Sequence, residues 1–365
     1  MDRRSFLTKA ALGGAAGSAA LAAPAIAQSS PQITWRVTSS FPKALDTIYG
    51  AAETMAKYVN EMTDGGLTLQ VFPAGELVPG LEAADAVSAG TIEVCHTASY
   101  YFWGKDPTYA LGTTVPFGLN YRQMNAWLYY GGGIDMLNEF FHTQNLHYLP
   151  CGNTGVQMGG WFNKEINSAD DLKGLKMRIP GQGGQVLTKL GASTVSLPGG
   201  QIYENLVSGA IDATEWVGPF NDYFLKLYEA AKYYYWPGMH EPGAQLTLGA
   251  NKAWFTSLSK TDQEIIKAAA NEENQKTLAE TNANNGAYLN RLINEHGVEL
   301  KEFNDDVYAA FGRAAQEVLE ESKAHSDLAA RIMTSVEKAR DEIGAWTSIS
   351  DMAYVQKRNK VLGMN

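Results

Sequence analysis

The first hundred residues contain short apolar segments in a repeating order. Three segments alternate between apolar and polar residues with the period of two that is typical of strands, and these are 33–38, 67–72 and 92–97. Residues 44–62 and 80–89 have the spacing of amphipathic helices, and Gly90 is a typical helix terminator. The order strand, helix, strand, helix, strand predicts an α/β unit with a largely parallel sheet. In such units ligands bind at the carboxyl ends of the strands.

The same order recurs between residues 175 and 216. Three segments have the composition of strands, and these are 175–179, 194–197 and 211–216. Helical patterns at 185–190 and 201–208 separate them. A second α/β lobe is therefore expected, in agreement with a length of 365 residues, which exceeds what one core usually organises.

A return to the first sheet is expected after the second lobe. The apolar, glycine-spaced residues 244–250 follow Pro242 and predict a strand that crosses back. A helix should begin at Ser259 and run to His296, with Gly297 as its cap.

A second long helix should follow Asn304, because apolar residues continue at helical or heptad spacing as far as Trp346. This length is unusual for a globular domain. Such a helix would brace both lobes or pack against a partner subunit.

The first 27 residues have the features of an export signal. Arg3 and Arg4 precede an uncharged stretch rich in Ala and Gly, and the small residues Ala25 and Ala27 place a cleavage site before Gln28. Paired arginines followed by Phe and Leu are typical of the twin-arginine route, which predicts a periplasmic mature protein. The apolar stretch is too short and too rich in glycine to span roughly 30 Å of hydrocarbon.

Composition and motifs exclude several classes of function. The chain has 29 basic and 39 acidic side chains, and signal cleavage would remove three basic ones and one acidic one. A nucleic-acid partner is not expected, because phosphate binding needs a basic face. The six histidines form no His-Glu-x-x-His pair, and the sequence contains neither a Gly-x-Ser-x-Gly elbow nor a Cys-x-x-Cys-His haem motif. An enzyme is therefore not expected either.

One arginine is placed where it could bind an anion. Arg178 lies at the carboxyl end of a predicted strand, just before Pro180 and the glycine-rich loop 181–184. From there its guanidinium could form a bidentate fork to a carboxylate. A solvated arginine on a surface strand would fit the same pattern. The loop lacks the Gly-Lys-Ser/Thr ending of a nucleotide-binding loop, so a nucleotide is not expected.

Acidic residues follow two predicted strands in the same half of the chain. Glu215 and Trp216 end one of these strands, and His240 and Glu241 follow the strand region 233–236. Carboxylates that converge on a cleft for an anion would repel it unless a cation lies between them. A metal-bridged carboxylate site is one interpretation, and solvated acidic residues at strand ends are the other.

Two aromatic runs, 100–103 and 233–236, also allow two interpretations. They could form the wall of a small-ligand pocket, because such pockets are lined largely by aromatic and apolar side chains. They could equally pack in the core as parts of strands.

Four segments together carry a resemblance to a known family. They are Trp35-Arg36-Val37, 71–77 (Val-Phe-Pro-Ala-Gly-Glu-Leu), 168–178 (Ser-Ala-Asp-Asp-Leu-Lys-Gly-Leu-Lys-Met-Arg) and 206–215 (Leu-Val-Ser-Gly-Ala-Ile-Asp-Ala-Thr-Glu). With these segments the mature chain resembles the extracytoplasmic solute-binding proteins of TRAP transporters, of the C4-dicarboxylate-binding type. Within that family it is most similar to the subgroup that binds α-keto acids.

The resemblance implies an α/β fold of the two-lobed periplasmic binding protein type, with crossover strands at a hinge near 150–153 and 241–244 and a long C-terminal helix. The implied parts of the chain are the export signal 1–27, lobe I at 28–152 plus about 242–260, lobe II with a bridging helix at 153–241 plus about 261–303, and the C-terminal helix and tail at 304–365. In the subgroup the last helix is exchanged between the subunits of a homodimer. Closure on the ligand would involve no chemical step.

The resemblance also implies the ligand contacts. Arg178 would clamp the ligand carboxylate, and Gln157 would reach both the ligand and a cation. Tyr100, Tyr101 and Phe220 would form the aromatic wall. The implied ligand is a small 2-oxo monocarboxylate of the pyruvate or 2-oxobutyrate type, which the permease subunits in the membrane would receive.

A bound cation is the remaining part of the implied site. Glu215 and Trp216 would hold it together with Gln157, Trp216 would also contact the ligand, and Glu241 would be a further cation ligand. Sodium is expected, calcium is the alternative, and no catalytic cofactor is expected. A 2-oxo or 2-hydroxy acid offers two neighbouring oxygens that can chelate one ion, whereas a plain dicarboxylate does not.

Three alternatives stay open from the sequence. One is a binding protein for lactate or a C4-dicarboxylate with calcium, since an acidic cage of Glu215 and Glu241 would favour a divalent ion. Another is a secreted metal-dependent keto-acid lyase or hydrolase, for which the sequence offers no obvious general base. The third is a sensory or scaffold protein that dimerises through its C-terminal helix and does not need Arg178.

Overall fold

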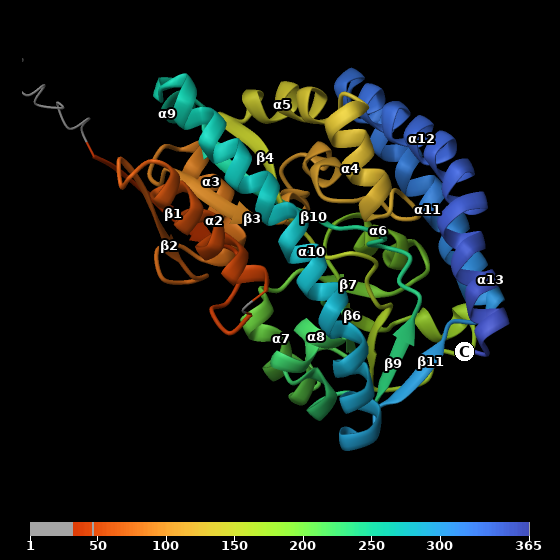
Figure 1. Ribbon diagram of the computed structural model, residues 1–365. Helices are drawn as coiled ribbons and strands as arrows, with labels where there is room; N and C mark the ends of the chain where they lie inside the picture. Colours follow the sequence, from red (N-terminus) through yellow and green to blue (C-terminus); the bar gives the residue numbers. More distant parts are fainter. Residues whose placement is uncertain (1–31, 46, 365) are drawn as a thin grey trace, which may run out of the picture. The chain divides into compact units, whose positions relative to one another are not determined.

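Five strands form the first sheet of the computed structural model, which describes residues 32–45 and 47–364 (Figure 1). Their order is β2-β1-β3-β10-β4, and their bounds are β1 Ile33–Ser39, β2 Leu67–Phe72, β3 Val94–Thr97, β4 Leu146–Asn153 and β10 Gln245–Asn251. β1 pairs in parallel with β2 and β3, whereas β10 lies antiparallel between β3 and β4. The expected return of the chain to the first sheet is therefore confirmed. The export signal predicted at 1–27 lies outside the described residues.

Six strands form the second sheet, in the order β11-β9-β5-β8-β6-β7. Their bounds are β5 Gly160–Phe162, β6 Lys176–Arg178, β7 Ser193–Val195, β8 Ala213–Thr214, β9 Tyr233–Trp236 and β11 Glu299–Glu302. β6 pairs in parallel with β7 and β8, as the repeated pattern predicts, and β5 is antiparallel to β8 and β9. The two-lobed α/β prediction is confirmed. We call the sheets with their surrounding helices lobe I and lobe II.

The α-helices in the described part of the chain are α2 Ile48–Met62, α3 Ala83–Ser88, α4 Tyr121–Tyr130, α5 Gly133–Thr143, α6 Gly181–Lys189, α7 Gly199–Val207, α8 Pro219–Phe224, α9 Lys252–Ser257, α10 Lys260–His296, α11 Asp305–Ala324, α12 Asp327–Thr347 and α13 Ala353–Leu362. A 3-10 turn at Ser99–Phe102 follows β3, and a π-helical turn at Ser348–Met352 precedes α13. None of the helices within 32–45 and 47–364 has both the length and the apolar character needed to cross a bilayer.

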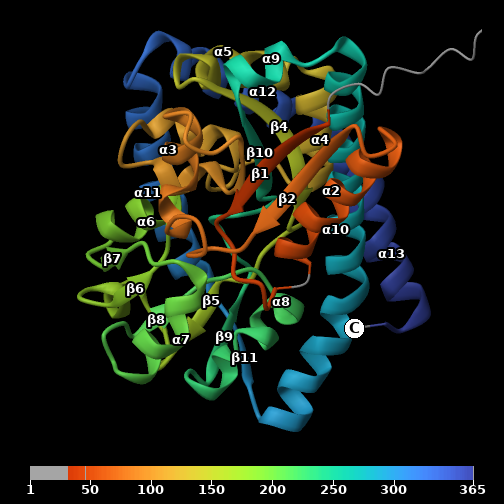
Figure 2. The same ribbon diagram turned by 90° about the vertical axis from the view of Figure 1, so that its left-hand side faces the viewer.

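Helix α10 connects the two lobes. Ser259 caps its first turn by accepting a hydrogen bond from the backbone N–H of Asp262, and Gly297 ends it with a φ of 65°. Both ends agree with the sequence prediction. The helix packs against β4 and α2 in lobe I and against α8 in lobe II, and Figures 1 and 2 show it alongside both. The chain also passes between the lobes from β4 to β5 and from β9 to β10.

The C-terminal helical region is interrupted, so the prediction of one long helix is wrong. α11 ends at Ala324 and α12 begins at Asp327, with the side chain of Ser326 accepting a hydrogen bond from the backbone N–H of Ala329. α11 packs on α6 and contributes to the core of lobe II, whereas α12 packs on α4 and α5 and contributes to the core of lobe I. The serine cap interrupts the helix, and the two halves of the apolar stripe serve different cores.

The aromatic run 233–236 forms strand β9 and packs in the core. The ring of Tyr234 stacks on Trp161 with centroids 3.9 Å apart, and the ring of Tyr235 stacks on Phe303 at 4.7 Å. Tyr234 and Tyr235 therefore have the core role that the sequence left open.

Candidate functional site

Arg178 and Glu215 lie side by side because their strands are neighbours. Arg178 ends β6 opposite Thr214 of β8, and Glu215 follows Thr214 directly. The Nη1 atom of Arg178 donates to Oε1 of Glu215 at 2.5 Å and to the carbonyl oxygen of Glu215 at 3.1 Å. The two side chains are 1% and 0% exposed, so the interpretation as a solvated surface arginine is wrong. Glu215 is neutralised by an arginine rather than left as an isolated repulsive charge.

The rest of the Arg178 guanidinium is only partly satisfied. Its Nε donates to the carbonyl oxygen of Leu197 at 3.1 Å, and its central carbon lies 5.2 Å from the ring centroid of Trp216. Nη2 is buried and has no hydrogen-bond partner among the described residues. A buried donor left unpaired costs about 1–3 kcal/mol, and more when it is charged. An incoming acceptor that reached Nη2 would remove this cost.

Gln157 and Glu241 form a second pair where the chain passes between the lobes. Nε2 of Gln157 donates to Oε2 of Glu241 at 2.7 Å and to Oγ1 of Thr154 at 3.0 Å. The backbone N–H of Gln157 donates to the carbonyl oxygen of Glu241 at 3.0 Å, so the two crossing segments are hydrogen-bonded here. Oε1 of Gln157 is buried and, within the described chain, has no hydrogen-bond partner. A free amide oxygen therefore lies beside a carboxylate.

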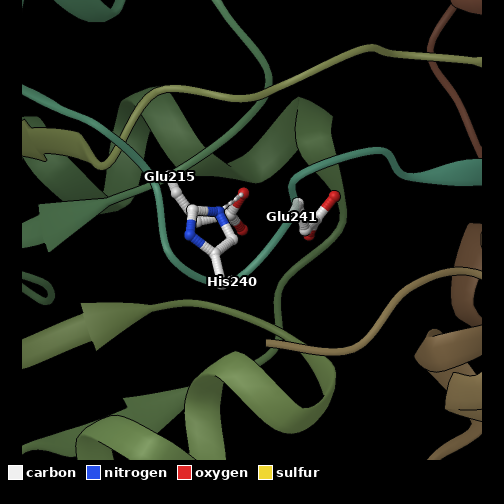
Figure 3. Close-up of side chains that lie close together, drawn as sticks. All are labelled: Glu215, His240 and Glu241. Atoms are coloured by element: carbon white, nitrogen blue, oxygen red, sulfur yellow. Dashed lines mark hydrogen bonds and ion pairs between the residues drawn. The ribbon is translucent and has the colours of Figure 1, made fainter. Parts of the chain in front are cut away.

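His240 joins the two carboxylates into one cluster (Figure 3). Its Nε2 lies 3.3 Å from Oε2 of Glu215, and potential ligand atoms of Glu215, His240 and Glu241 all lie within 4.8 Å of one another. All three side chains are buried. No role was predicted for His240, although its position next to Glu241 in the sequence was a signal that it would lie in the same place.

The cluster has the ligand atoms of a site for a hard cation. The carboxylates of Glu215 and Glu241 and the free Oε1 of Gln157 supply oxygen, which sodium and calcium prefer. Burial, followed by the nearby charge of Glu215, raises the pKa of Glu241 well above its ordinary value. A positive ion between the two carboxylates would offset both effects. The residues therefore fit a bound cation.

Tyr100 and Tyr101 lie next to this cluster. They belong to the 3-10 turn after β3, and their ring centroids are 4.9 Å apart. Burial raises the pKa of both hydroxyls, that of Tyr101 to about 12, and the charges of Arg178 and Glu241 also act on both. A Cβ atom at Gly181 would lie 3.0 Å from the Cβ of Tyr100, so this turn of lobe I directly contacts the start of α6 in lobe II.

Trp216 and Phe220 have different surroundings. The ring of Trp216 packs so closely on Gly199 that a Cβ added there would lie 2.5 Å from it, and its Nε1 is a buried donor without a partner in the described part of the chain. The ring of Phe220 contacts Phe224 and Tyr288, where α8 meets α10. Trp216 thus lies beside the charged cluster, while the place of Phe220 in the ligand wall stays a prediction.

Asp222 is a buried carboxylate that was not predicted from the sequence. It accepts hydrogen bonds from Nε1 of Trp161 at 2.9 Å, from the hydroxyl of Tyr234 at 2.8 Å and from the backbone N–H groups of Val217 and Gly218, both at 3.0 Å. Burial raises its pKa to about 6 in spite of these four donors. The bonds hold the turn that follows β8, and no local sequence signal predicts them.

Comparison with known proteins gives this arrangement a context. Residues 38–325 match the family described as bacterial extracellular solute-binding protein, family 7. The chain belongs to this family. The resemblance to the solute-binding proteins of TRAP transporters is therefore confirmed, and the members of this family are binding components of transporters.

Three relatives are especially informative. A monocarboxylate 2-oxoacid-binding periplasmic protein of Nostoc sp. (strain PCC 7120) is 46% identical over 324 residues, which cover 89% of this chain and 88% of the relative. A TRAP transporter solute-binding protein from Bordetella bronchiseptica, a dimer with calcium and picolinate in one active site and an apo second site, is 39% identical with a TM-score of 0.89 over 91% of this chain and 99% of that chain. One from Pseudoalteromonas atlantica, with sodium and pyruvate bound, is 38% identical with a TM-score of 0.86 over 89% and 99% of the two chains.

Proposed function

We propose that this protein captures a small 2-oxo monocarboxylate of the pyruvate or 2-oxobutyrate type together with a cation, and delivers the acid to a TRAP membrane permease. The observation that carries the proposal is one buried cluster in which Nη2 of Arg178 and Oε1 of Gln157 both lack partners beside Glu215 and Glu241. The cluster combines a cationic fork with oxygen ligands. The 46% identical 2-oxoacid-binding relative supports the same class of ligand.

In this proposal each group has its own role. Arg178 binds the carboxylate of the acid, and Gln157 contacts both the acid and the cation. Glu215 and Glu241 are the acidic ligands of the cation, and Trp216 contacts both the acid and the cation. Tyr100, Tyr101 and Phe220 form the wall, Phe220 by resemblance alone. The bound cation would supply the positive charge that allows an anion to share a buried site with two carboxylates.

Sodium is the cation that we expect, and calcium is the alternative. The relative from Pseudoalteromonas atlantica has sodium bound, whereas the one from Bordetella bronchiseptica has calcium. Both ions prefer oxygen ligands, so the donor atoms of the cluster suit either.

The proposed capture involves closure of the lobes about a hinge near 150–153 and 241–244, with no chemical step. Gly152 has a φ of 107°, and its N–H donates to Oδ1 of Asn274 on α10 at 3.2 Å. Nε2 of Gln245 donates to the carbonyl oxygen of Gly152 and to Oδ1 of Asn274, both at 2.7 Å. These bonds attach both crossing segments to α10 at the proposed hinge. The proposed division stays lobe I at 28–152 and about 242–260, and lobe II with the bridging helix at 153–241 and about 261–303.

The C-terminal segment is proposed to contact a second copy of the chain. The residues of α13 and of the turn before it expose apolar side chains, namely Ile349, Met352, Tyr354, Val361 and Leu362. A groove of about 470 Å³ between the start of α4 and this segment is lined in part by Tyr121 and Val355. Light scattering of the mature protein should give the mass of a dimer, and truncation after Thr347 should give a monomer. A monomeric full-length protein would contradict this part of the proposal.

Residues 1–27 are proposed to direct the protein to the periplasm by the twin-arginine route, and a periplasmic relative supports that compartment. Expression in cells with and without a working twin-arginine translocase, followed by fractionation, tests the route. Replacing Arg3 and Arg4 by lysine should retain the protein in the cytoplasm.

Calorimetric titration of the ligand-stripped mature protein tests the main proposal. Pyruvate, 2-oxobutyrate, lactate and succinate are added in sodium buffer, in calcium buffer and in choline buffer with a chelator, and the acids are assayed afterwards. Stoichiometric binding of 2-oxo acids without turnover supports the proposal and identifies the ion. A preference for lactate or succinate would change the ligand class, and product formation would indicate a metal-dependent lyase or hydrolase.

A further inference from the structure

Glu215 is bound to the part of Arg178 that a ligand carboxylate would need. A guanidinium has five N–H donors in a rigid fork, and bidentate binding uses two that point the same way. Nη1 donates to both the side-chain and the main-chain oxygen of Glu215. Nε donates to the carbonyl oxygen of Leu197. Of the three nitrogens, only Nη2 lacks a partner within the described residues.

Neither edge of the fork is therefore open to a bidentate acid. The edge formed by Nη1 and Nη2 is blocked at Nη1, and the edge that includes Nε is blocked at Nε. The Leu197 oxygen belongs to the backbone and is fixed by the fold, whereas the Glu215 oxygen belongs to a side chain that can change its rotamer. Glu215 is thus the partner that can be displaced.

We propose that Glu215 is an internal competitor of the ligand, whose carboxylate holds Nη1 of Arg178 and has to leave it before the acid can form a bidentate contact. The inference rests on the proposed function, because it assigns a second role to a residue of the same site. His240 offers the displaced carboxylate a neighbouring partner, since its Nε2 already lies 3.3 Å from Oε2 of Glu215. Glu241 lies within the same cluster.

The competition has a consequence for how acid and cation bind. Oε2 of Glu215 can face a cation while Oε1 stays on Arg178, but a cation that binds both oxygens has to draw the carboxylate away from Nη1. A conformation in which the Glu215 carboxylate has left Arg178 favours the binding of both the acid and the cation. Acid binding and cation binding should therefore favour each other, and by linkage the coupling must be equal in both directions.

The Glu215→Gln variant tests the competition by isothermal titration with pyruvate in three buffers, which contain choline with a chelator, sodium, or calcium. Glutamine keeps the size of the side chain but is a weaker partner for a guanidinium. In choline buffer the variant should bind pyruvate roughly tenfold more tightly than the unmodified protein, or about 1.4 kcal/mol. Addition of sodium should then raise the pyruvate affinity of the variant less than it raises that of the unmodified protein. Equal or weaker binding by the variant in choline buffer would overturn the inference.

Glu241→Gln is the matched control, because Glu241 belongs to the same cluster but its carboxylate accepts from Gln157 instead of Arg178. In this variant sodium should no longer raise the pyruvate affinity, and the affinity in choline buffer should not exceed that of the unmodified protein. An equal gain in both variants would mean that the removal of any negative charge suffices, which would also overturn the competition.

Loss of the charge of Glu215 could destabilise the fold, because Arg178 is buried. Melting temperatures with and without pyruvate therefore accompany the titrations, and pyruvate in choline buffer should raise that of Glu215→Gln more than that of the unmodified protein. If Glu215→Gln does not fold, Glu215→Asp replaces it, because aspartate keeps the charge but has a shorter reach. This variant should still show part of the gain in pyruvate affinity in choline buffer. No gain would equally contradict the inference. An unmodified protein that binds no 2-oxo acid in any buffer refutes the proposed function, whereas binding in sodium without a gain by the variants refutes only this inference.

Discussion

Two sites in lobe II contain buried carboxylates, and they differ in how completely the surrounding polar atoms are hydrogen-bonded. Asp222 accepts four hydrogen bonds, two from aromatic side chains and two from backbone N–H groups. The cluster of Glu215 and Glu241 lies next to two unpaired polar atoms, Nη2 of Arg178 and Oε1 of Gln157. Both groups exclude water to a similar extent, so burial alone does not distinguish a structural carboxylate from a binding one.

The difference between these groups is in their unused bonding capacity. Buried polar atoms in folded proteins are usually paired, and each exception needs an explanation. The four donors that reach Asp222 are all paired with its two oxygens, and they fix the turn after β8. Around Glu215 a donor and an acceptor are both left over, and they match the two kinds of atom that a carboxylate and a cation would bring. Unpaired atoms of opposite character are therefore the better indicator of a site.

The largest expected effect comes from Arg178→Ala. Pyruvate binding should weaken by about 3 kcal/mol or more, roughly two orders of magnitude, because the anion loses its cationic partner. The free energy of unfolding should also fall, by about 3–5 kcal/mol, because Glu215 is left buried and unpaired. Titration calorimetry and urea denaturation measure the two losses.

A double variant separates these two losses. Arg178→Ala with Glu215→Gln removes both charges, so it should recover much of the stability while pyruvate binding stays as weak as in Arg178→Ala. Recovery of binding in the double variant, or tight binding by Arg178→Ala itself, would remove Arg178 from the site.

Glu273 on α10 is intermediate between these two sites, because only one of its two carboxylate oxygens is hydrogen-bonded. Its Oε1 accepts a hydrogen bond from Thr277 at 3.0 Å, and its Oε2 is buried and, within the described residues, has no partner. Burial raises its pKa from 4.5 to about 7. A raised pKa means that the folded protein favours the neutral acid, so this group's contribution to stability is present below pH 4.5, declines as the pH rises, and is lost above about pH 7.

Glu273→Gln should remove this pH dependence. Between pH 4.5 and pH 7 the free energy of unfolding of the unmodified protein should fall by about 3 kcal/mol relative to the variant. Urea denaturation at several pH values measures the difference between the two proteins. Parallel pH profiles would show that Glu273 titrates normally.

A smaller effect is expected from Asp222→Asn. The amide keeps one acceptor oxygen but places an N–H₂ group opposite donors, so the free energy of unfolding should fall by about 2 kcal/mol. Asp222 is paired within lobe II and lies outside the charged cluster, so affinity for pyruvate should change less than stability does. A large loss of affinity with little loss of stability would mean that the two groups of carboxylates are not separate.

The smallest effect is expected from Trp216→Phe. Nε1 of Trp216 has no hydrogen-bond partner within residues 32–45 and 47–364, so its removal breaks no hydrogen bond. The smaller ring packs less fully against Gly199, so the free energy of unfolding should fall by about 1 kcal/mol. If the indole N–H donates to the ligand, pyruvate binding should weaken by about 1 kcal/mol, or roughly fivefold. Unchanged affinity would limit Trp216 to a packing role.

Much of the fold follows from local patterns. Strands β1, β2, β3 and β10 and the complete helix α10 agree with the sequence prediction, because alternation, capping by Ser259 and the terminal Gly297 are local signals. The break at Ser326 was missed because the apolar spacing continues across it. Only the packing of α11 and α12 on different lobes shows why the chain stops and restarts there.

The site was predictable only in part. The adjacency of Arg178 and Glu215 follows from two neighbouring parallel strands that end together, which a strand-level prediction can anticipate. The roles of His240 and Asp222 depend on side chains that meet across long sequence separations. A pattern within one segment contains no information about such partners, so the sequence alone could not reveal that Glu215 is held from both sides.

The two-residue interruption between α11 and α12 has a mechanical consequence. One helix is anchored on lobe II and the other on lobe I, so this turn adds a covalent tether to the three other connections between the lobes. Each tether removes rotational degrees of freedom from one lobe relative to the other. The lobes can then rotate relative to each other only about a defined axis. Less orientational entropy is therefore lost when they close on a ligand as small as pyruvate.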